Sequence, residues 1–391
     1  LHLITGPLGT IYGAYETIIQ DLCSYEKDDR KILPKYVVST ATIKNAHEQI
    51  RCLYGRKKSM QFPANGFEIG DSFFIKEISI EDKPFRKYVG ISASGQSMKT
   101  TTLRAYAIVL QTASELMLEE KYKDVIDPYY TLVGYFNSIR ELGGTVRLLQ
   151  DDIPKRINRL RKKYNFKTIR YLNNRREITS RIPSSRITER LGELEVSSDK
   201  KGALDTAIAT NMIAVGMDVD RLGLMTVMGQ PKQNSEYIQA TSRIGRQHPG
   251  LVFTLYNPYR PRDLSHYENF VGYHSQLYRY VEGTTATPFS ARARDRVLHS
   301  LIIAAMRLEM PEYADNTKAK DIGNLSLEEK SHIINVILDR LAIVNPQARD
   351  DTKEEIERFL GDWQCMAAQS KPLVYYVGNK YLEKYNRLMN Y

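Results

Sequence analysis

The chain has 391 residues, of which 42% are hydrophobic and 26% charged, so it is long enough for two or three domains and its composition excludes wholesale disorder. Its formal charge of +10 favours an anionic partner such as nucleic acid, although a basic surface that serves only solubility is an equal alternative on composition alone. No apolar run approaches the roughly 18–20 residues that a membrane span needs, so no membrane partner is expected.

Residues 1–86 show a helix, strand, helix pattern that ends in a connector. Apolar spacing predicts helices over 8–23 and 44–54. The β-branched run 35–40 predicts a short strand between them. Residues 61–86 contain proline and glycine and are predicted to be the connector.

Residues 87–310 alternate short apolar runs with longer helical patterns. The predicted strands are 88–92, 130–134, 206–209, 222–228 and 251–256, and the predicted helices are 100–119, 137–142, 235–243 and 266–280. Because strands that alternate with helices build parallel sheets, the fold class is predicted to be α/β, with one parallel sheet and helices on both faces. Ligands of such folds gather at the carboxyl ends of the strands.

Residues 311–391 predict a helical tail. Ser326-x-x-Glu329 and Thr352-x-x-Glu355 have the form of capping boxes, and each precedes apolar residues at helical spacing. The tyrosines of the tail are expected to pack in the protein interior more than to stack on bases; they are Tyr375, Tyr376, Tyr381, Tyr385 and Tyr391.

Two segments that follow predicted strands carry the most specific pattern of the chain. Residues 209–218 read ATNMIAVGMD, and residues 236–246 read EYIQATSRIGR. The first resembles motif V of the superfamily 2 helicases, T-x-x-x-x-x-G-x-D, and the second resembles their motif VI, Q-x-x-x-R-x-G-R. Either match alone is weak, but the two occur in the family's order and spacing. The resemblance implies a RecA-like fold and an ATPase that acts on nucleic acid.

Arg243 and Arg246 are the predicted catalytic residues. Charge spreads over the γ-phosphate oxygens in the transition state of phosphoryl transfer, and a guanidinium from a second domain neutralises it. On a helix, the spacing of the two arginines would place both on one face. Gln239, one turn earlier, is expected to sense the nucleotide. The alternative is an amphipathic helix with two surface arginines, and the neighbouring motif V pattern disfavours it.

The motif V segment contributes three further predictions. Thr210 is expected to hydrogen-bond a phosphate of the nucleic-acid track. Gly216 permits a turn that a side chain would block, and Asp218 could accept a hydrogen bond from a ribose or orient an arginine. Gly216 and Asp218 are therefore placed with Gln239 in the cofactor-binding set. Val215 stands where an arginine is frequent in the family, which weakens the case for an interdomain contact there.

Two weaker matches lie upstream. Ser39, Thr40, Ala41 and Thr42 resemble motif III, which in the family couples the nucleotide state to the grip on nucleic acid. The same residues fit a strand end that runs into a helix N-cap at Thr42. Residues 132–138 have the position of motif IV, at a predicted strand-to-helix junction.

Residues 155–176 form the most basic stretch, in which ten of 22 residues are basic and none is acidic. Phosphate neutralisation with aromatic stacking is how single strands are held without sequence preference. A solvated charged face is the alternative. The predicted nucleic-acid-binding residues here are Arg159, Lys162 and Lys163, and the interleaved aromatic residues are Tyr164, Phe166 and Tyr171.

The resemblance implies ATP and Mg²⁺ as cofactors, yet no GxxxxGK[ST] phosphate-binding loop occurs in the chain. Residues 90–97 have the nearest spacing, but Gln96 replaces the lysine, so a strand-turn-helix is predicted there. The chain begins at Leu1-His2 without an initiator methionine. We therefore expect a fragment, with the phosphate-binding lysine and the magnesium-binding acidic residues upstream. On its own, this fragment is expected not to hydrolyse ATP.

Cysteine and histidine usage predicts no metal site and no disulfide. Cys23, Cys52 and Cys365 are odd in number and far apart, which fits a reducing compartment such as the cytoplasm. The seven histidines do not pair with cysteines at zinc spacing.

Three segments narrow the resemblance further. Residues 6–10, 257–268 and 288–296 resemble the helicase subunit of the bacterial DISARM anti-phage system, and the similarity runs over about residues 1–310. This resemblance implies DNA as the track, phage defence as the setting, and other subunits of a defence complex as partners.

Together these patterns predict three segments. Residues 1–86 are expected to be the C-terminal remainder of a first RecA-like motor domain with a linker, 87–310 a second RecA-like helicase domain, and 311–391 a helical extension. The predicted function is an ATP-dependent helicase or translocase. The alternative is a non-catalytic nucleic-acid-binding subunit with a helicase-like fold. A nuclease is disfavoured because the sequence shows no HxK pair and no acidic cluster with basic residues at a fitting spacing.

Overall fold

The computed structural model describes all residues except 2, 41, 64–66, 68–70, 72, 75, 80, 83–85, 212–218, 379–383, 390 and 391. The chain forms two compact units. The sheet unit spans 65–282, and the helical unit combines 1–64 with 283–391. These bounds differ from the predicted segments because the last long helix before residue 310 packs with the N-terminal helices.

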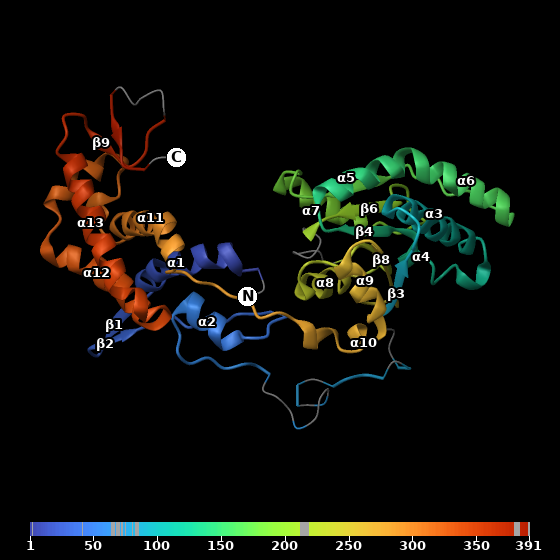
Figure 1. Ribbon diagram of the computed structural model, residues 1–391, viewed down its shortest axis with the longest axis horizontal. Coiled ribbons are helices and arrows are strands. Elements are labelled where there is room, and N and C mark those ends of the chain that lie inside the picture. The colour runs from blue at the N-terminus through green and yellow to red at the C-terminus, as the bar shows by residue number, and fades with distance from the viewer. Residues whose placement is uncertain are drawn as a thin grey trace. The chain divides into compact units, whose positions relative to one another are not determined.

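The sheet unit is built on a parallel sheet, which confirms the predicted α/β class (Figure 1). Its strand order is β3-β8-β7-β4-β6-β5, and every described pairing in it is parallel. The strands are β3 (Arg86–Ser92), β4 (Leu132–Phe136), β5 (Arg175–Ile178), β6 (Thr206–Ala209), β7 (Leu224–Met228) and β8 (Gly250–Tyr256). The connections that leave β4 and β7 run in opposite directions along the sheet, because β4 leads to β5 and β7 leads to β8.

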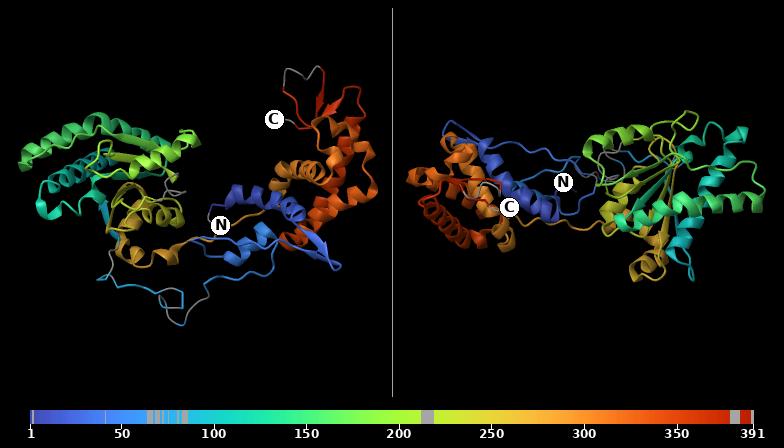
Figure 2. Two further views of the ribbon diagram at one scale, coloured as in Figure 1. Left: turned by 180° about the vertical axis from the view of Figure 1, so that it is seen from behind. Right: turned by 90° about the horizontal axis from the view of Figure 1, so that it is seen from above.

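Helices cover both faces of this sheet, as Figure 2 shows. Side chains alternate along β4, so Val133 and Tyr135 join one core while Leu132 and Phe136 join the other. The first core includes residues of α7 (Ser184–Leu194), α8 (Asn234–Thr241) and α10 (Phe270–His274), and the second includes residues of α3 (Met98–Leu116), α5 (Ile139–Arg147) and α6 (Ile153–Tyr164). The shorter elements are η1 (Glu120–Tyr122), α4 (Asp127–Tyr130), η2 (Leu148–Asp152), α9 (Pro261–Glu268) and η4 (Leu277–Tyr280).

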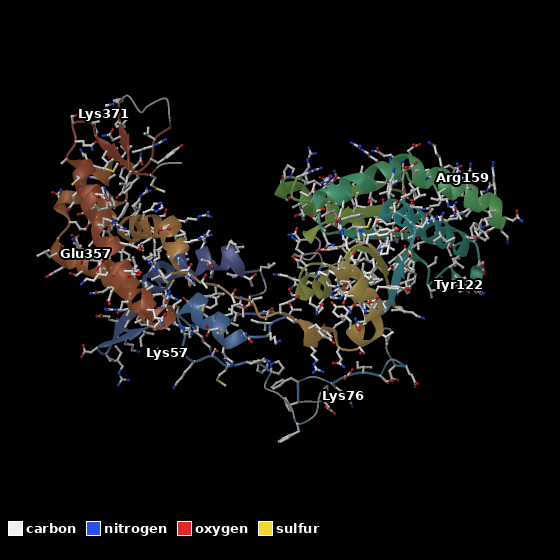
Figure 3. All side chains as sticks on the ribbon, viewed as in Figure 1. Lys57, Lys76, Tyr122, Arg159, Glu357 and Lys371 are labelled. Carbon is white, nitrogen blue, oxygen red and sulfur yellow. The ribbon has the colours of Figure 1, made fainter. Side chains whose placement is uncertain are left out.

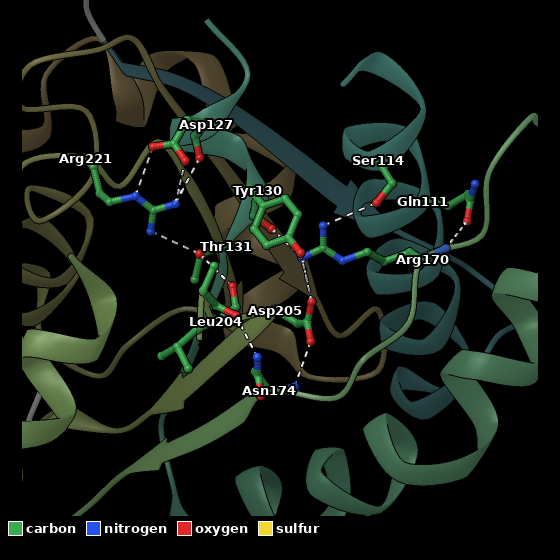
Figure 4. A network of polar contacts seen from close by, with 11 residues as sticks. Gln111, Ser114, Asp127, Tyr130, Thr131, Arg170, Asn174, Leu204, Asp205 and Arg221 are labelled. Atoms are coloured by element: carbon green, nitrogen blue, oxygen red, sulfur yellow. Dashed lines mark hydrogen bonds and ion pairs between the residues drawn. The ribbon is translucent and has the colours of Figure 1, made fainter. Parts of the chain in front are cut away.

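One buried ion pair and one partly buried ion pair anchor the amino ends of the central strands (Figure 4). Arg170 binds Asp205 at 2.9 Å and lies over the ring of Tyr130, 3.4 Å from its centroid. Arg221 binds Asp127 at 3.0 Å. Both carboxylates also accept backbone N–H groups, so the buried charge of Asp205 is both paired and hydrogen-bonded, as a buried charge must be. These contacts stabilise the amino end of the sheet.

The helical unit consists of long helices and small strand pairs. Its helices are α1 (Gly6–Leu22), α2 (Ala46–Tyr54), α11 (Ala291–Glu309), α12 (Leu327–Val344) and α13 (Arg349–Ala367), with η5 (Pro311–Tyr313), η6 (Asn316–Asn324) and η7 (Pro346–Ala348). Its strands are β1 (Tyr25–Lys27), β2 (Arg30–Ile32), β9 (Leu373–Val374) and β10 (Asn386–Arg387). Asp28 and Asp29 both have positive φ, as the two-residue turn of the β1–β2 hairpin requires.

One core joins the two ends of the chain in this unit. Ile18 of α1 packs with Leu301 of α11, Ile337 of α12 and Trp363 of α13. Arg340 is 4% exposed and donates to the carbonyl oxygens of residues 16 and 53. Residues 311–391 are therefore part of one folded unit with residues 1–64.

Several local predictions hold. The helices at 8–23 and 44–54 form, and Ser326 makes the predicted capping box with Glu329. Tyr375 is fully buried, as expected of a packing tyrosine, whereas Tyr376 is exposed. Tyr381 and Tyr391 lie outside the described residues.

Other local predictions are wrong. Residues 35–40 form no strand, because Val37 is 89% exposed and the segment pairs with no described strand. Thr352 lies inside α13, where its hydroxyl donates to the carbonyl of Ala348, so it is not an N-cap. The predicted helix 266–280 is divided among α9, α10 and η4, and strand β5 was not predicted.

None of the helices in the described part of the chain is long and apolar enough to cross a membrane.

Candidate nucleotide and nucleic-acid site

The candidate site lies at the carboxyl edge of the sheet. Strand β4 ends at Phe136 and is followed by Asn137 and by Ser138, which caps α5 by accepting a hydrogen bond from the N–H of Glu141. The amide of Asn137 donates to the carbonyl of Met228 at the end of β7, at 2.8 Å. The connections of β4 and β7 diverge here, and such switch points are where open α/β sheets bind ligands. The predicted strand-to-helix junction at 132–138 is confirmed.

A cavity of about 360 Å³ opens beside this junction. It brings Asn137 and Ser138 together with Thr210, which follows β6 and is 7% exposed. The other lining residues are Tyr135, Phe136, Ile139, Ser180, Asn211, Lys232, Gln233 and Glu236. Hydroxyl, amide and ammonium groups thus face one space, and burial raises the pKa of Glu236. The structure therefore unites the motif IV-like and motif V-like residues that the sequence separates by about 70 positions.

The loops on the other side of the junction are tied together by residues that sequence reasoning missed. Asp263 is 4% exposed and accepts the N–H groups of Gln230, after β7, and Asn257, after β8. Arg262 donates to the carbonyls of Gln230 and Lys232. The contacts of Asp263 and Arg262 with Gln230 and Lys232 carry no signal in the spacing of the sequence, because these partners lie 30 to 33 residues away.

Arg243 and Arg246 follow α8 in a turn, which corrects the prediction that both stand on one face of a helix. Helix α8 ends at Thr241, and Gly245 has a φ of +72° that ends regular helix. Both arginines are half-buried, and burial lowers the pKa of Arg243. Gln239 is also half-buried and lies within the last turn of α8.

The turn is held from the edge strand of the sheet. Arg86 of β3 donates to the carbonyls of Ile244, at 2.5 Å, and Ser242, at 3.3 Å. The N–H of Gly245 donates to the carbonyl of Leu222. A Cβ at Gly245 would come within 2.7 Å of the Gly250 backbone, so only glycine fits this close approach. The backbone that carries Arg243 and Arg246 is thus held by the Arg86 side chain, by the carbonyl of Leu222 and by the close packing of Gly245 on Gly250.

The predicted basic stretch divides into exposed and internal parts. Arg159, Lys162 and Lys163 are exposed on α6, and Figure 3 labels Arg159 on this helix. Arg170 is buried in its ion pair, and Arg176 pairs with Glu193 of α7 at 2.6 Å. Of the aromatic residues, Tyr164 and Tyr171 are exposed while Phe166 is half-buried.

The exposed cations of α6 do not line the carboxyl-edge cavity. Helices α5, η2 and α6 follow one another without interruption from Ile139 to Tyr164 (Figure 1). At about 1.5 Å of rise per residue, Arg159 lies roughly 30 Å from the start of α5. The structure therefore places the predicted phosphate contacts of Thr210 and of α6 in two separate regions of the sheet unit.

The motif III-like residues lie in the helical unit. Ser39 is exposed and Thr42 is buried, and the N–H of Thr42 donates to the hydroxyl of Thr40. Helix α2 begins at Ala46 with Asn45 before it, so Thr42 is not its N-cap. Ala41, and also Val215, Gly216 and Asp218 of the motif V segment, lie outside the described residues.

Residues 90–97 form the strand-turn-helix that the missing lysine predicts. Strand β3 ends at Ser92, and the hydroxyl of Ser97 accepts the N–H of Thr100 at the start of α3. The first turn of α3 is thereby capped by the chain's own side chain.

A family model described as "Helicase conserved C-terminal domain" matches residues 155–248. The match runs from α6 to the turn after α8 and so includes β5, β6, β7 and both arginines.

A curated relative covers most of the chain. "DISARM protein DrmA" of Bacillus paralicheniformis is 53% identical over 380 residues, which are 97% of this chain and 34% of that protein. The chain thus spans about a third of the length of this relative. Over 81 residues, "Nucleolar RNA helicase 2-B" of Xenopus laevis is 28% identical, which covers 20% of this chain and 10% of that protein.

Among solved structures, the helicase MrfA bound to DNA shares the fold with a TM-score of 0.50 and 14% identity, covering 78% of this chain and 34% of that one. Its structure bound to DNA and AMPPNP gives the same TM-score at 15% identity. Residues 155–248 therefore match the helicase conserved C-terminal domain, in a chain that is similar along nearly its whole length to one third of a DISARM protein.

Proposed function

We propose that this chain provides the second RecA-like lobe, with an attached helical unit, of an ATP-dependent DNA helicase or translocase that acts in phage defence. The observation that carries the proposal is the cavity that joins Asn137, Ser138 and Thr210 at the switch point of the matched helicase domain. The similarity of this chain to a DISARM protein supports the proposed role in phage defence and the proposal that further defence subunits are its partners.

On the nucleotide side, the two arginines are the working groups of this chain. Their half-buried position suits an anion, since a guanidinium partly withdrawn from water binds phosphate more strongly than an exposed one. Arg246 and Arg243 would neutralise charge that develops on the γ-phosphate, with Gln239 beside them. MgATP supplies the phosphoryl group when bound, and we assign the groups that hold its Mg²⁺ to a first lobe outside this sequence.

On the nucleic-acid side, Thr210 and Ser138 would donate their hydroxyl hydrogens to phosphate oxygens of one strand. Contacts of this kind fix register along the backbone without reading sequence. Gly216 and Asp218 belong to the same proposed segment. The exposed cations of α6 would act as an outer contact for nucleic acid beyond the cavity, through charge alone.

The test measures binding of the full chain to a fluorescein-labelled single-stranded DNA by anisotropy. Thr210→Val and Ser138→Ala are each expected to weaken binding by about 10-fold, the effect of one lost hydrogen bond to a charged group. Ser275→Ala, an exposed serine of the same unit, is the matched control and should bind as wild type. Equal binding by all three variants would overturn the cavity assignment.

The ATPase part is tested in the longer protein that also contains the first lobe. DNA-stimulated phosphate release supports a motor. DNA binding without any stimulated hydrolysis would instead support the alternative, a non-catalytic nucleic-acid-binding subunit.

A further inference from the structure

Three side chains from three helices converge in the helical unit, outside the segments that resemble helicase motifs. They are Asp21 in the last turn of α1, Glu309 at the end of α11 and His332 in α12. One oxygen or nitrogen atom from each lies within 4.8 Å of the others. All three helices pack on one another in the shared core (Figure 1), so the geometry of the cluster is set by the fold.

Two of the three spacings among these atoms lie near those between metal ligands, and the shorter one is a hydrogen bond in this structure. Nε2 of His332 lies 3.0 Å from a carboxylate oxygen of Glu309 and 3.5 Å from one of Asp21. A tetrahedral metal with bonds of about 2.0–2.2 Å places its ligand atoms roughly 3.3–3.6 Å apart. A small adjustment of one side chain would therefore complete the arrangement.

The cluster also contains an unsatisfied buried acceptor. The side chain of Glu309 is 8% exposed and that of Asp21 is 13% exposed. Among the described residues, Oε1 of Glu309 is buried with no hydrogen-bond partner, which ordinarily costs stability. Burial and the neighbouring Asp21 carboxylate raise the pKa of Glu309, as expected where two acidic groups share one site. A cation at this point would give the unpaired Oε1 of Glu309 a partner.

We propose that Asp21, Glu309 and His332 bind one divalent transition-metal ion, with zinc as the best fit, and that the ion ties α1, α11 and α12 together. Zinc accepts imidazole nitrogen and carboxylate oxygen, with water as the fourth ligand. Magnesium and calcium are disfavoured because they take oxygen ligands and not imidazole. His332 is 49% exposed, which gives the ion a path from solvent.

The competing explanation is a simple ion-pair cluster, in which protonated His332 bridges the two carboxylates. Lys31 of β2 already contacts Oδ1 of Asp21 and offsets part of the negative charge. That lysine leaves Oδ2 of Asp21 and both oxygens of Glu309 to the rest of the cluster. The two explanations differ in whether the purified protein takes up metal.

The experiment is isothermal titration of ZnCl₂ into the full chain at pH 7.5, after removal of metal with EDTA and dialysis. We expect one equivalent bound with a Kd of roughly 10 µM or tighter, a rise in Tm that EDTA reverses, and no saturable binding of MgCl₂. His332→Ala and Glu309→Gln should each weaken zinc binding by at least about 100-fold.

Two further variants make the result decisive. His47→Ala removes an exposed histidine of the same unit and should bind zinc as wild type. Lys31→Met removes the competing cation and should tighten binding several-fold. Because His332 is half-exposed, His332→Ala should keep the wild-type circular dichroism. Absence of saturable zinc binding by the wild type, or equal binding by folded His332→Ala, would overturn the proposal and leave the ion-pair cluster.

Discussion

Two cationic regions of the sheet unit differ in how their charges are held. Arg243 and Arg246 are half-buried in a turn whose backbone is fixed by Arg86 and by the close approach of Gly245 to its neighbour. Arg159, Lys162 and Lys163 are exposed on helix α6. A fixed and partly desolvated guanidinium can meet charge at one position, whereas exposed charges act over many positions and are screened by salt. This difference supports the proposed roles of the turn in ATP hydrolysis and of the helix in general nucleic-acid contact.

The largest effect is expected from Arg246→Ala in the longer protein for which we propose ATP hydrolysis. Turnover should fall by about 10³-fold or more while nucleotide Kd stays near the wild-type value, because the guanidinium meets charge that develops mainly in the transition state. Arg246→Lys should not restore full turnover, since an ammonium lacks the planar fork. DNA-stimulated kcat and nucleotide Kd are the measurements, with exposed Arg279→Ala as control. Wild-type turnover by Arg246→Ala would remove the distinction between the two regions.

A smaller effect should follow from loosening the turn without touching its arginines. Arg86→Met removes both donors to the turn but keeps the length of the apolar side chain. We expect kcat to fall by about 10- to 100-fold, as for displaced catalytic groups, with little change in KM. Steady-state kinetics on Arg86→Met and on Lys87→Met, the next residue of β3, would test this. Equal kinetics of the two variants would mean that the turn keeps its geometry without Arg86.

The exposed helix should respond in salt dependence instead of turnover. Reversal of Arg159, Lys162 and Lys163 to glutamate should weaken binding to single strands of any sequence and flatten the slope of log K against log[salt] by roughly 0.7 for each lost phosphate contact. Anisotropy titrations over a range of NaCl concentrations measure both quantities. Reversal of exposed Lys121 and Lys123 is the control. If the slope of log K against log[salt] did not change, α6 would be a solvated charged face that makes no contact with nucleic acid.

The smallest effect concerns pH and the packing behind α8. Nδ1–H of His274 donates to the carbonyl of Phe270, and its Nε2 is hydrogen-bonded to the hydroxyl of Tyr237 in α8. Burial lowers the pKa of both His274 and His266. In mildly acidic solution the unfolded chain therefore binds protons at these two histidines more readily than the folded unit does. The stability from these groups is present above the unfolded pKa of about 6.5 and is lost as pH falls below it toward the lowered folded-state pKa.

Hydrogen-exchange protection factors of α8, corrected for intrinsic exchange, should therefore fall several-fold between neutral pH and mildly acidic pH. Protection of α6 should change less. His274→Gln should flatten the response of α8, because glutamine does not titrate. The same pH response in that variant would show that His274 is not its source.

Much of the sheet unit could be predicted from sequence because its signals are local. Strand β6 has the predicted bounds, and β4, β7 and β8 lie within two residues of theirs, since short apolar runs between helical patterns belong to buried parallel strands. Strand β5 was missed because three of its four residues are charged, and their neutralisation depends on partners such as Glu193 in another helix. The site residues from Thr210 to Arg246 stay predictions.

The sequence alone determined the α/β class, the helicase-like motifs and their order, because each depends on residues a few positions apart. Only the tertiary structure decided that residues 35–40 form no strand, that Arg243 and Arg246 occupy a turn, and that Thr210 shares a cavity with Asn137 but not with α6. It also brought Asp21, Glu309 and His332 together. The physical reason is that strand pairing, buried ion pairs and ligand clusters depend on contacts between segments far apart along the chain, which local periodicity does not record.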